Sequence, residues 1–175
     1  MIQIQKEKWL KTGLMTLDKN GADQIKISTL CAQLQVTKGA FYHWFNSKKD
    51  FDLAMLEYWR NTFTEQFIVL SESGSSSKEK LTLLVRQCID GLSKGSRLEI
   101  EINMWSKQNP EIGEFVLSVY QQRFDYLMSL LNDIYSSKNE AKRHGLILYC
   151  LLIGCDLFFR SISNEEAELI FQEYL

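Results

Sequence analysis

The chain has 175 residues, of which 45% are hydrophobic, 24% are charged and 12% are aromatic, and its formal net charge is −2. This composition is that of a globular protein with a buried core, and it argues against intrinsic disorder. Because proline occurs once, at Pro110, and the nine glycines are scattered, helices can run uninterrupted, so we expect an all-α fold of about nine helices.

Charge is unevenly distributed along the chain. Residues 1–50 contain eight lysines and four acidic residues, a balance of +4, and the rest of the chain carries −6. A nucleic acid responds to local rather than average potential, so a basic N-terminal region suits a DNA partner. The alternative at this point is a solvated lysine face with no partner.

The four cysteines, Cys31, Cys88, Cys150 and Cys155, lie within apolar helical segments. They form no CxxC motif, so we expect reduced core residues, no metal site and no cofactor. No signal peptide opens the chain, and the longest apolar run, residues 145–159, is too short to cross a bilayer. These features predict a soluble, cytoplasmic protein with no membrane partner.

Three helices are predicted in the N-terminal region. The first covers about residues 4–20 and ends at Gly21, because glycine tolerates the left-handed conformation that closes a helix. The second covers about residues 28–34. Thr37 is placed to cap a third short helix that reaches about Trp44.

A longer series of helices follows. Ser47 and Asp50 form a capping-box-like start for a long helix, which ends in the Gly/Ser-rich loop at residues 71–77. Asn109 followed by Pro110 is typical of a helix start, with asparagine as the cap. We expect the later helices at about residues 78–93, 97–107, 110–135, 140–161 and 164–174.

The two short helices and their tight turn form the arrangement that presents a recognition helix to the major groove of DNA. The apolar positions predicted to hold them together are Leu30, Leu34, Val36, Phe41 and Phe45. Cations, hydroxyls, small residues and an imidazole are predicted to face outward at Thr37, Lys38, Gly39, Ala40, Tyr42 and His43. This surface chemistry favours DNA binding.

This segment resembles the head of the TetR family of repressors, and the register holds without a gap from Trp9 to Glu57. The matching positions are Leu30, Val36, Thr37, Lys38, Gly39, Phe41, Tyr42, His43, Phe45, Ser47 and Lys48. Two positions depart from the family pattern. Gln35 replaces the usual turn glycine, so we expect it in the left-handed region. Lys26 replaces the usual Ser or Thr cap, so we expect the second helix to begin at Ser28.

The resemblance implies a TetR-like fold with a three-helix DNA-binding head at residues 1–48, whose motif covers 26–45. The remainder, 49–175, would be a helical body for ligand binding and dimerisation. DNA contacts are implied for Ser28, Thr29, Thr37, Lys38, Gly39, Ala40, Tyr42, His43 and Lys48.

In this assignment Lys48 and the hydroxyls of Thr37 and Tyr42 bind phosphate, and Lys38 reaches a phosphate or guanine. Each has an alternative. Tyr42 could be a half-buried packing residue, Lys48 a solubility charge, Ser28 only a helix cap, and His43 could pack on the neighbouring helix.

The resemblance also implies a homodimer formed by the last two long helices. The sequence gives an independent reason, because the second of them is apolar on more than one face and one face needs a partner. The interface candidates are Phe124, Leu127, Leu131, Ile147, Leu151, Gly154 and Phe158. The alternative is a central helix buried wholly within the monomer.

Two heads in one dimer predict a near-palindromic operator in double-stranded DNA. In family members a small molecule in the body releases DNA, and an apolar or aromatic ligand is expected here. The candidates for the pocket wall, which could equally be plain core, are Trp59, Phe63, Phe67, Cys88, Met104 and Trp105.

These observations predict a ligand-responsive transcriptional repressor. The alternative is a nucleoid-associated or architectural DNA-binding dimer without an inducer. An enzyme is disfavoured, because the sequence has no glycine-rich phosphate loop, no clustered metal ligands and no nucleophile-elbow pattern.

Overall fold

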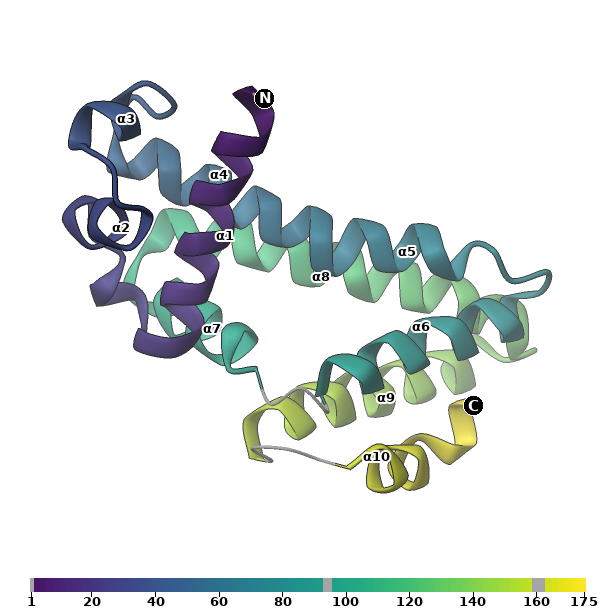
Figure 1. Ribbon diagram of the computed structural model, residues 1–175. Helices are drawn as coiled ribbons and strands as arrows, with labels where there is room; N and C mark the ends of the chain where they lie inside the picture. Colours follow the sequence, from purple (N-terminus) through teal and green to yellow (C-terminus); the bar gives the residue numbers. More distant parts are fainter. Residues whose placement is uncertain (1, 93–95, 159–162) are drawn as a thin grey trace. The chain divides into compact units, whose positions relative to one another are not determined.

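The computed structural model describes residues 2–92, 96–158 and 163–175, and these residues are helical with no strand (Figure 1). The ten α-helices are α1 Ile2–Asn20, α2 Ile27–Leu34, α3 Lys38–Tyr42, α4 Lys48–Arg60, α5 Gln66–Ser71, α6 Ser77–Leu92, α7 Leu98–Gln108, α8 Pro110–Ile134, α9 Lys138–Phe158 and α10 Asn164–Phe171. A π-helical segment covers Asn61–Glu65, between α4 and α5 in sequence, and short 3-10 turns cover Ala22–Gln24 and Gln172–Tyr174. The predicted all-α class and the expected nine or so helices are confirmed for the described residues.

The helices form two compact units. Unit 1 comprises Met1–Thr62 and Arg97–Glu114, and unit 2 comprises Phe63–Ser96 and Phe115–Leu175. The functional division predicted at residue 48 therefore does not coincide with the packing, because all of α4 and α7 and the first residues of α8 pack with the head.

Unit 1 is built around a close crossing of α1 and α4. Gly13 of α1 leaves no room for a side chain, since a Cβ atom there would lie 2.5 Å from Met55 Sδ and 2.7 Å from Phe51 Cζ. A hydrogen bond from the Tyr58 hydroxyl to Glu7 Oε1, at 3.2 Å, links the same two helices. These contacts fix the direction of α1, which carries part of the head's positive charge.

Two polar contacts fasten α7 to unit 1. The Arg97 backbone N–H donates to Asp18 Oδ1 at 2.6 Å, which ties the start of α7 to α1. The buried Trp59 indole donates its Nε1–H to Glu99 Oε1 at 3.0 Å, which ties α7 to α4. A buried indole N–H needs such an acceptor, so these contacts hold α7 firmly on the head.

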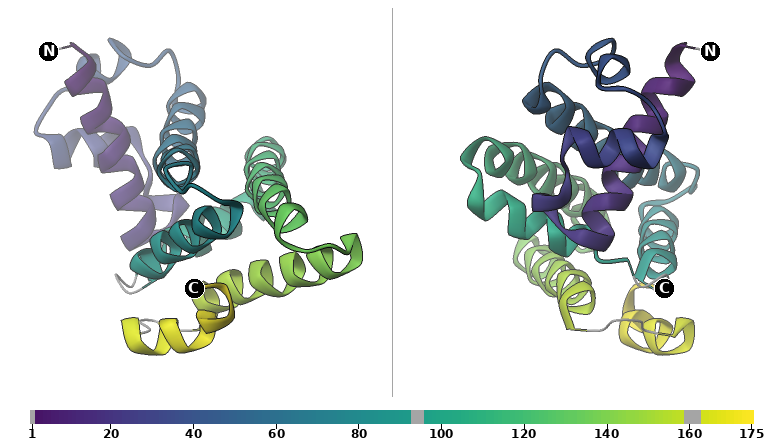
Figure 2. Two further views of the ribbon diagram at one scale, coloured as in Figure 1. Left: turned by 90° about the vertical axis from the view of Figure 1, so that its right-hand side faces the viewer. Right: turned by 60° about the vertical axis from the view of Figure 1, so that its left-hand side comes forward.

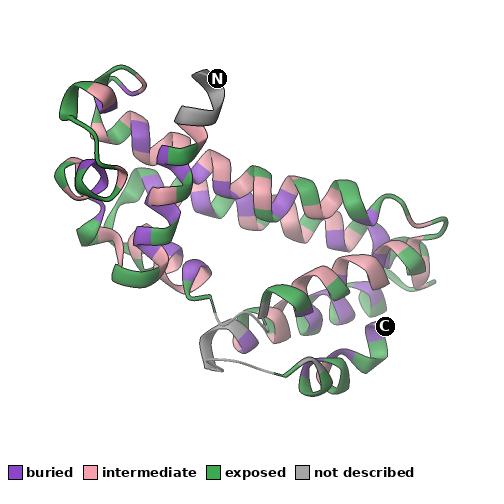
Figure 3. Ribbon diagram, in the orientation of Figure 1, coloured by how far each residue is buried: buried purple, intermediate pink, exposed green. Residues whose placement is uncertain are grey.

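Unit 2 is a helical bundle in which α6 lies against α5, α9 and α10 (Figures 1 and 2). Within it α8 and α9 approach closely at Gly145, where a Cβ atom would lie 2.5 Å from Met128 Sδ. The core of unit 2 includes Leu127, Leu131 and Leu148. Buried (purple) and exposed (green) residues alternate along its helices (Figure 3). The backbone and side chain of Ser163 and Glu166 form a capping box that starts α10.

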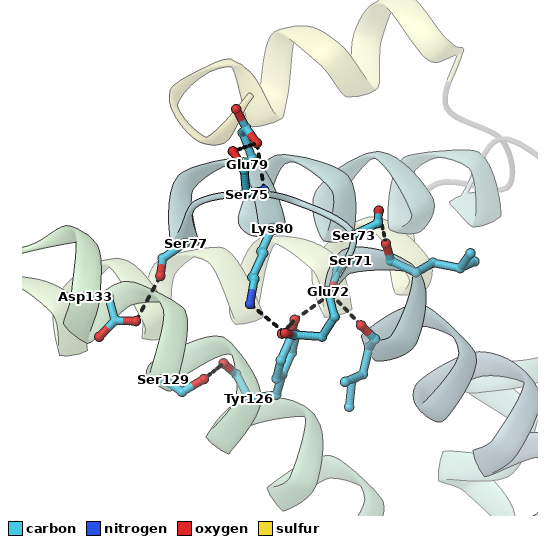
Figure 4. A network of polar contacts seen from close by, with 12 residues as sticks. Ser71, Glu72, Ser73, Ser75, Ser77, Glu79, Lys80, Tyr126, Ser129 and Asp133 are labelled. Carbon is cyan, nitrogen blue, oxygen red and sulfur yellow. Dashed lines mark hydrogen bonds and ion pairs between the residues drawn. The ribbon is translucent and has the colours of Figure 1, made fainter.

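A polar network closes the turn between α5 and α6 and links it to α8 (Figure 4). The Ser71 and Tyr126 hydroxyls lie 2.5 Å apart, and the Tyr126 hydroxyl donates to Glu72 Oε1 at 2.6 Å. Lys80 pairs with the other oxygen of Glu72 at 2.5 Å and lowers the pKa of that carboxyl. Burial, together with the hydrogen bond to Glu72, raises the pKa of Tyr126 to about 12. The network therefore holds Tyr126 as a neutral donor.

The cysteines are free thiols, but not all of them are core residues. Cys31 and Cys155 are buried as expected, whereas Cys88 is half-buried and Cys150 is exposed. The expectation of a core position was wrong for Cys150, because its side of α9 faces away from the unit 2 core.

Candidate nucleic-acid interface

The turn between α2 and α3 is closed by a left-handed residue. Gln35 has φ 57° and ψ 43°, as its replacement of the turn glycine predicted. Its N–H donates to Ala32 O at 3.2 Å, and the N–H of Val36 donates to Cys31 O at 3.0 Å. These bonds satisfy the last carbonyls of α2, which offsets part of the strain of about 1 kcal/mol that a side chain meets in this region.

Aromatic packing fixes the recognition helix α3 on the head. Phe41 and Phe45 are fully buried, with ring centroids 5.2 Å apart. The edge of Trp9 from α1 meets Phe41 at 5.5 Å, and Phe51 from α4 meets Phe45 at 5.0 Å. Because α1 and α4 both supply aromatic contacts to one side of α3 and the turn after it, the other side of α3 is held in a defined direction.

Val36 does not belong to this packing. We expected it to hold α2 and α3 together, but its side chain is 41% exposed, while Leu30 is buried and Leu34 is half-buried. The left-handed backbone at Gln35 redirects the chain just before Val36 and turns its side chain outward.

Five of the six residues predicted to face outward are exposed. Thr37, Lys38, Gly39, Tyr42 and His43 are exposed, and Ala40 is half-buried. Tyr42 is 55% exposed even though its ring meets Phe41 edge-on at 5.3 Å, so a half-buried packing role is not what the structure shows. The His43 ring meets the neighbouring Trp44 edge-on at 4.9 Å. The exposed side of α3 is therefore polar and cationic.

The hydroxyl groups at the starts of α2 and α3 are not used as caps. α2 begins at Ile27 with Lys26 at the cap position, one residue earlier than expected, which places Ser28 inside the first turn and exposed. Ser28 is thus not the helix cap, and Thr29 beside it is half-buried. Thr37 occupies the cap position of α3 but makes no side-chain capping bond. The prediction for Thr37 is therefore confirmed for its position before α3 but not for a side-chain capping bond.

Gly39 has no steric reason within the chain to be a glycine. A Cβ atom built on it would lie 3.6 Å from Thr37 Oγ1, an ordinary contact, with no other described atom among its close neighbours. Its backbone also lacks the positive φ that favours glycine. The absence of a side chain leaves bare backbone on the exposed side of α3.

Lys48 is already engaged on its own helix. It forms an ion pair with Asp52, and its ammonium lies 5.8 Å from the Phe51 ring centroid and 5.9 Å from that of Trp105. Burial raises the pKa of Asp52, and Lys48 opposes that rise. A phosphate at Lys48 would have to compete with this carboxylate.

The start of α4 differs slightly from the expected capping box. The Ser47 hydroxyl accepts from the Asp50 N–H at 3.0 Å, as expected. The Asp50 carboxylate accepts from the Asn46 N–H at 2.9 Å rather than from that of Ser47. The start of α4 is therefore capped by Ser47 as expected, and the Asp50 carboxylate binds the backbone N–H one residue before the expected one. Asn109 caps the start of α8, as expected, because its Oδ1 accepts from the N–H groups of Glu111 and Ile112.

The six candidates for a pocket wall do not share one unit. Trp59, Met104 and Trp105 belong to unit 1, where Trp59 is a core residue and Met104 is half-exposed. Phe63, Phe67 and Cys88 belong to unit 2, and the rings of Phe63 and Phe67 lie 6.5 Å apart. Within unit 2, Arg123 donates from Nε to Thr64 Oγ1 at 2.7 Å, beside Phe63.

The dimer candidates divide into core and surface residues. Leu127 and Leu131 are buried in the core of their own unit against other helices, so placing them at an interface was wrong. Phe124 contacts Tyr149 at 5.5 Å and is half-buried, as is Leu151, whereas Ile147 is 45% exposed. The side chain of Phe158 lies outside the described residues.

An exposed apolar face of α9 was only partly anticipated. It follows the spacing i, i+1, i+4, i+7 and i+8, which is one side of a helix. We call it the α9 stripe, and it consists of Leu146, Ile147, Cys150, Ile153 and Gly154. A Cβ atom at Gly154 would meet nothing within 4 Å. Because α9 is apolar on more than one side, its sequence did not indicate which side faces the core of unit 2.

Two further kinds of site were sought in the described part of the chain. Within it, no helix is both long enough and apolar enough to cross a membrane. The same residues contain no group of three or more histidine, cysteine or acidic side chains that could hold a metal ion.

Sequence comparison finds transcriptional regulators that match part of the chain, while no protein-family model matches it. The chain is 28% identical over 86 residues to the transcriptional regulator AcuR of Cereibacter sphaeroides, which is 49% of this chain and 39% of AcuR. It is 33% identical over 72 residues to the HTH-type transcriptional repressor NemR of Escherichia coli, which is 41% of this chain and 36% of NemR. The matches thus span well under half the length of these relatives.

Solved structures match nearly the whole chain. A TetR-family transcriptional regulator from Streptomyces coelicolor has a TM-score of 0.79 at 19% identity, over 97% of this chain and 89% of that one. The reduced form of E. coli NemR has a TM-score of 0.77 at 22% identity, over 97% of this chain and 95% of that one. The resemblance predicted from the head is therefore confirmed as a TetR-family fold.

Proposed function

We propose that this chain, which has the fold of TetR-family regulators, is a homodimeric DNA-binding transcriptional repressor that a small molecule releases from its operator. The observation that carries the proposal is the two-sided character of α3. Its apolar residue Phe41 and the following Phe45 are buried, while Lys38, Tyr42 and His43 are exposed. A short helix anchored on one side and polar on the other is suited to the major groove.

The proposed contacts to DNA are of two kinds: contacts to phosphates position the head, and contacts to base edges read the sequence. Ser28, Thr37 and Tyr42 present hydroxyls that can donate to phosphates, which set position without reading sequence. Lys38, at the start of α3, can reach guanine O6 and N7, and the half-buried Ala40 methyl can contact a thymine methyl. Gly39 allows the backbone of α3 to approach the strand. The operator is therefore read mainly by the first turn of α3.

Dimerisation is assigned to the α9 stripe. Its exposed Leu146, Ile147 and Ile153 would leave water if α8 and α9 of two copies formed a four-helix bundle. The open space at Gly154 permits close approach of a partner helix. Two heads separated by about 34–36 Å then meet two half-sites on one face of the duplex, which requires a near-palindromic operator.

Release by a ligand is assigned to unit 2. A regulator from Saccharomonospora viridis with this fold was solved with choline, and the regulator FadR of Bacillus subtilis with stearoyl-CoA. In this chain Phe63, Phe67 and Cys88 are the apolar candidates for contact with a ligand. Such a ligand releases DNA only if it binds the DNA-free form more tightly. No step of this function requires catalysis by the chain.

Selection of binding sites from random duplexes with the purified chain tests the proposal. The expected product is a near-palindrome with half-sites about one helical turn apart. Recovery of no preferred sequence would contradict specific repression. Mapping of occupied sites in cells separates the remaining alternative, because a repressor occupies a few promoters and an architectural dimer occupies many dispersed sites.

A further inference from the structure

The lysines of the head differ in whether a carboxylate already neutralises them. Lys11 pairs with Glu7 at 2.7 Å, Lys48 with Asp52, and Lys49 with Glu111 at 2.9 Å. A paired lysine must give up its carboxylate before it can bind a phosphate, so unpaired lysines are the better phosphate ligands. Among the described residues of the head, Lys6, Lys8, Lys19, Lys26 and Lys38 form no ion pair with a carboxylate; of these, Lys38 lies in α3 and Lys6 contacts the turn that follows it.

Lys6 is held beside the recognition helix. Its Nζ lies 5.5 Å from the ring centroid of Phe45, within the range of a cation–π contact. Phe45 belongs to the turn that follows α3, and its N–H donates to Phe41 O at 3.0 Å. The start of α1 and α3 accordingly lie at the same end of unit 1 (Figures 1 and 2). Glu7, next in sequence, is occupied by Lys11 and Tyr58.

Lys6 and Lys38 therefore flank α3 at opposite ends. Lys38 is its first residue, and Lys6 lies against the turn after its last residue, Tyr42. A helix of this length extends only about 8 Å, and the major groove is about 12 Å wide. A cation beside the C-terminal end of α3 can thus reach the phosphates that border the groove while Lys38 and the rest of α3 contact the bases.

We propose that Lys6 is a phosphate-binding cation of the head, which clamps the DNA backbone beside the C-terminal end of the recognition helix. This inference rests on the proposed DNA-binding function. It adds to that function an element, the start of α1, that the helix-turn-helix motif does not include. A contact of this kind strengthens binding to every duplex and carries no sequence preference.

The test replaces Lys6 with Met, which keeps an unbranched chain against Phe45 and removes the charge. Affinity for the selected operator and for an unrelated duplex is measured between 50 and 200 mM monovalent salt. Losing one phosphate contact lowers the slope of log K against log salt by about 0.9, so the advantage of wild type over the variant shrinks about 3.5-fold across this range. The preference between the two duplexes is expected to stay unchanged.

Two further variants serve as controls. Lys19→Met removes an exposed, unpaired charge from the last turn of α1 and is expected to keep the wild-type slope. Lys6→Arg keeps the charge and is expected to keep the slope as well. A slope that falls in both Lys6 variants, or in neither, would overturn the assignment. A wild-type chain with no salt-dependent affinity for duplex DNA would instead overturn the proposed function itself.

Discussion

Gly39 offers a substitution whose effects on folding and on DNA binding have opposite signs. In the free chain an alanine fits, because its Cβ would lie 3.6 Å from Thr37 Oγ1 in ordinary contact. Alanine also restricts the unfolded chain and favours helix, so Gly39→Ala is expected to raise the free energy of unfolding by about 0.5–1 kcal/mol. Denaturant titration of the purified variant measures this gain.

DNA binding is expected to weaken in the same variant. The added methyl group occupies the surface where the α3 backbone approaches the operator, and loss of a close contact in the groove costs about 1–3 kcal/mol, which is roughly 5- to 150-fold in affinity. Titration of the selected operator, followed by fluorescence anisotropy, measures the affinity of the variant relative to wild type. The sign of the stability change shows that any loss does not come from unfolding.

Gly91 supplies the matched control. It lies in α6, is exposed, and has nothing within 4 Å of a built Cβ atom. Gly91→Ala is expected to raise stability by a similar amount, up to about 1 kcal/mol, and to leave operator affinity unchanged. If Gly39→Ala bound the operator as tightly as wild type, the placement of α3 against DNA would be refuted.

Three more predictions concern the turn, the dimer and the core. Gln35→Gly relieves the left-handed backbone and is expected to raise the free energy of unfolding by about 0.5–1 kcal/mol in denaturant titrations; a loss would contradict the observed φ. Ile153→Glu places a charge in the α9 stripe and is expected to yield monomers in analytical ultracentrifugation, whereas Val69→Glu, at an exposed apolar position on α5, is expected to leave dimers intact. Leu131→Ala is expected to lose about 2–5 kcal/mol of stability and Leu117→Ala, on the exposed side of α8, close to none; equal losses would contradict the assigned core.

Local features of the head could be predicted from the sequence because neighbouring residues determine them. The missing turn glycine places Gln35 in the left-handed region, and the burial of Phe41 and Phe45 follows from their spacing. The start of α8 follows from an asparagine before a proline. In each case the residues that decide the structure lie within one helical turn of each other.

Features that depend on distant partners could not be predicted in the same way. Leu127 and Ile147 both lie on apolar helices, and only the neighbouring helices determine that one is core and the other surface. Likewise, α7 joins unit 1 through bonds to Asp18 and Trp59, 79 and 40 residues away from their partners in sequence. Lys48 was assigned to phosphate without its partner Asp52, although spacing of i and i+4 in a helix signals such a pair.

The measurement that most directly tests the account is the stoichiometry and preference of the purified chain on its selected operator. Sedimentation of the complex at physiological salt is expected to show two protomers per near-palindromic duplex. Affinity for that duplex is expected to exceed affinity for a scrambled duplex of the same composition by about 1,000-fold or more. A single protomer per duplex with equal affinity for both sequences would contradict the account.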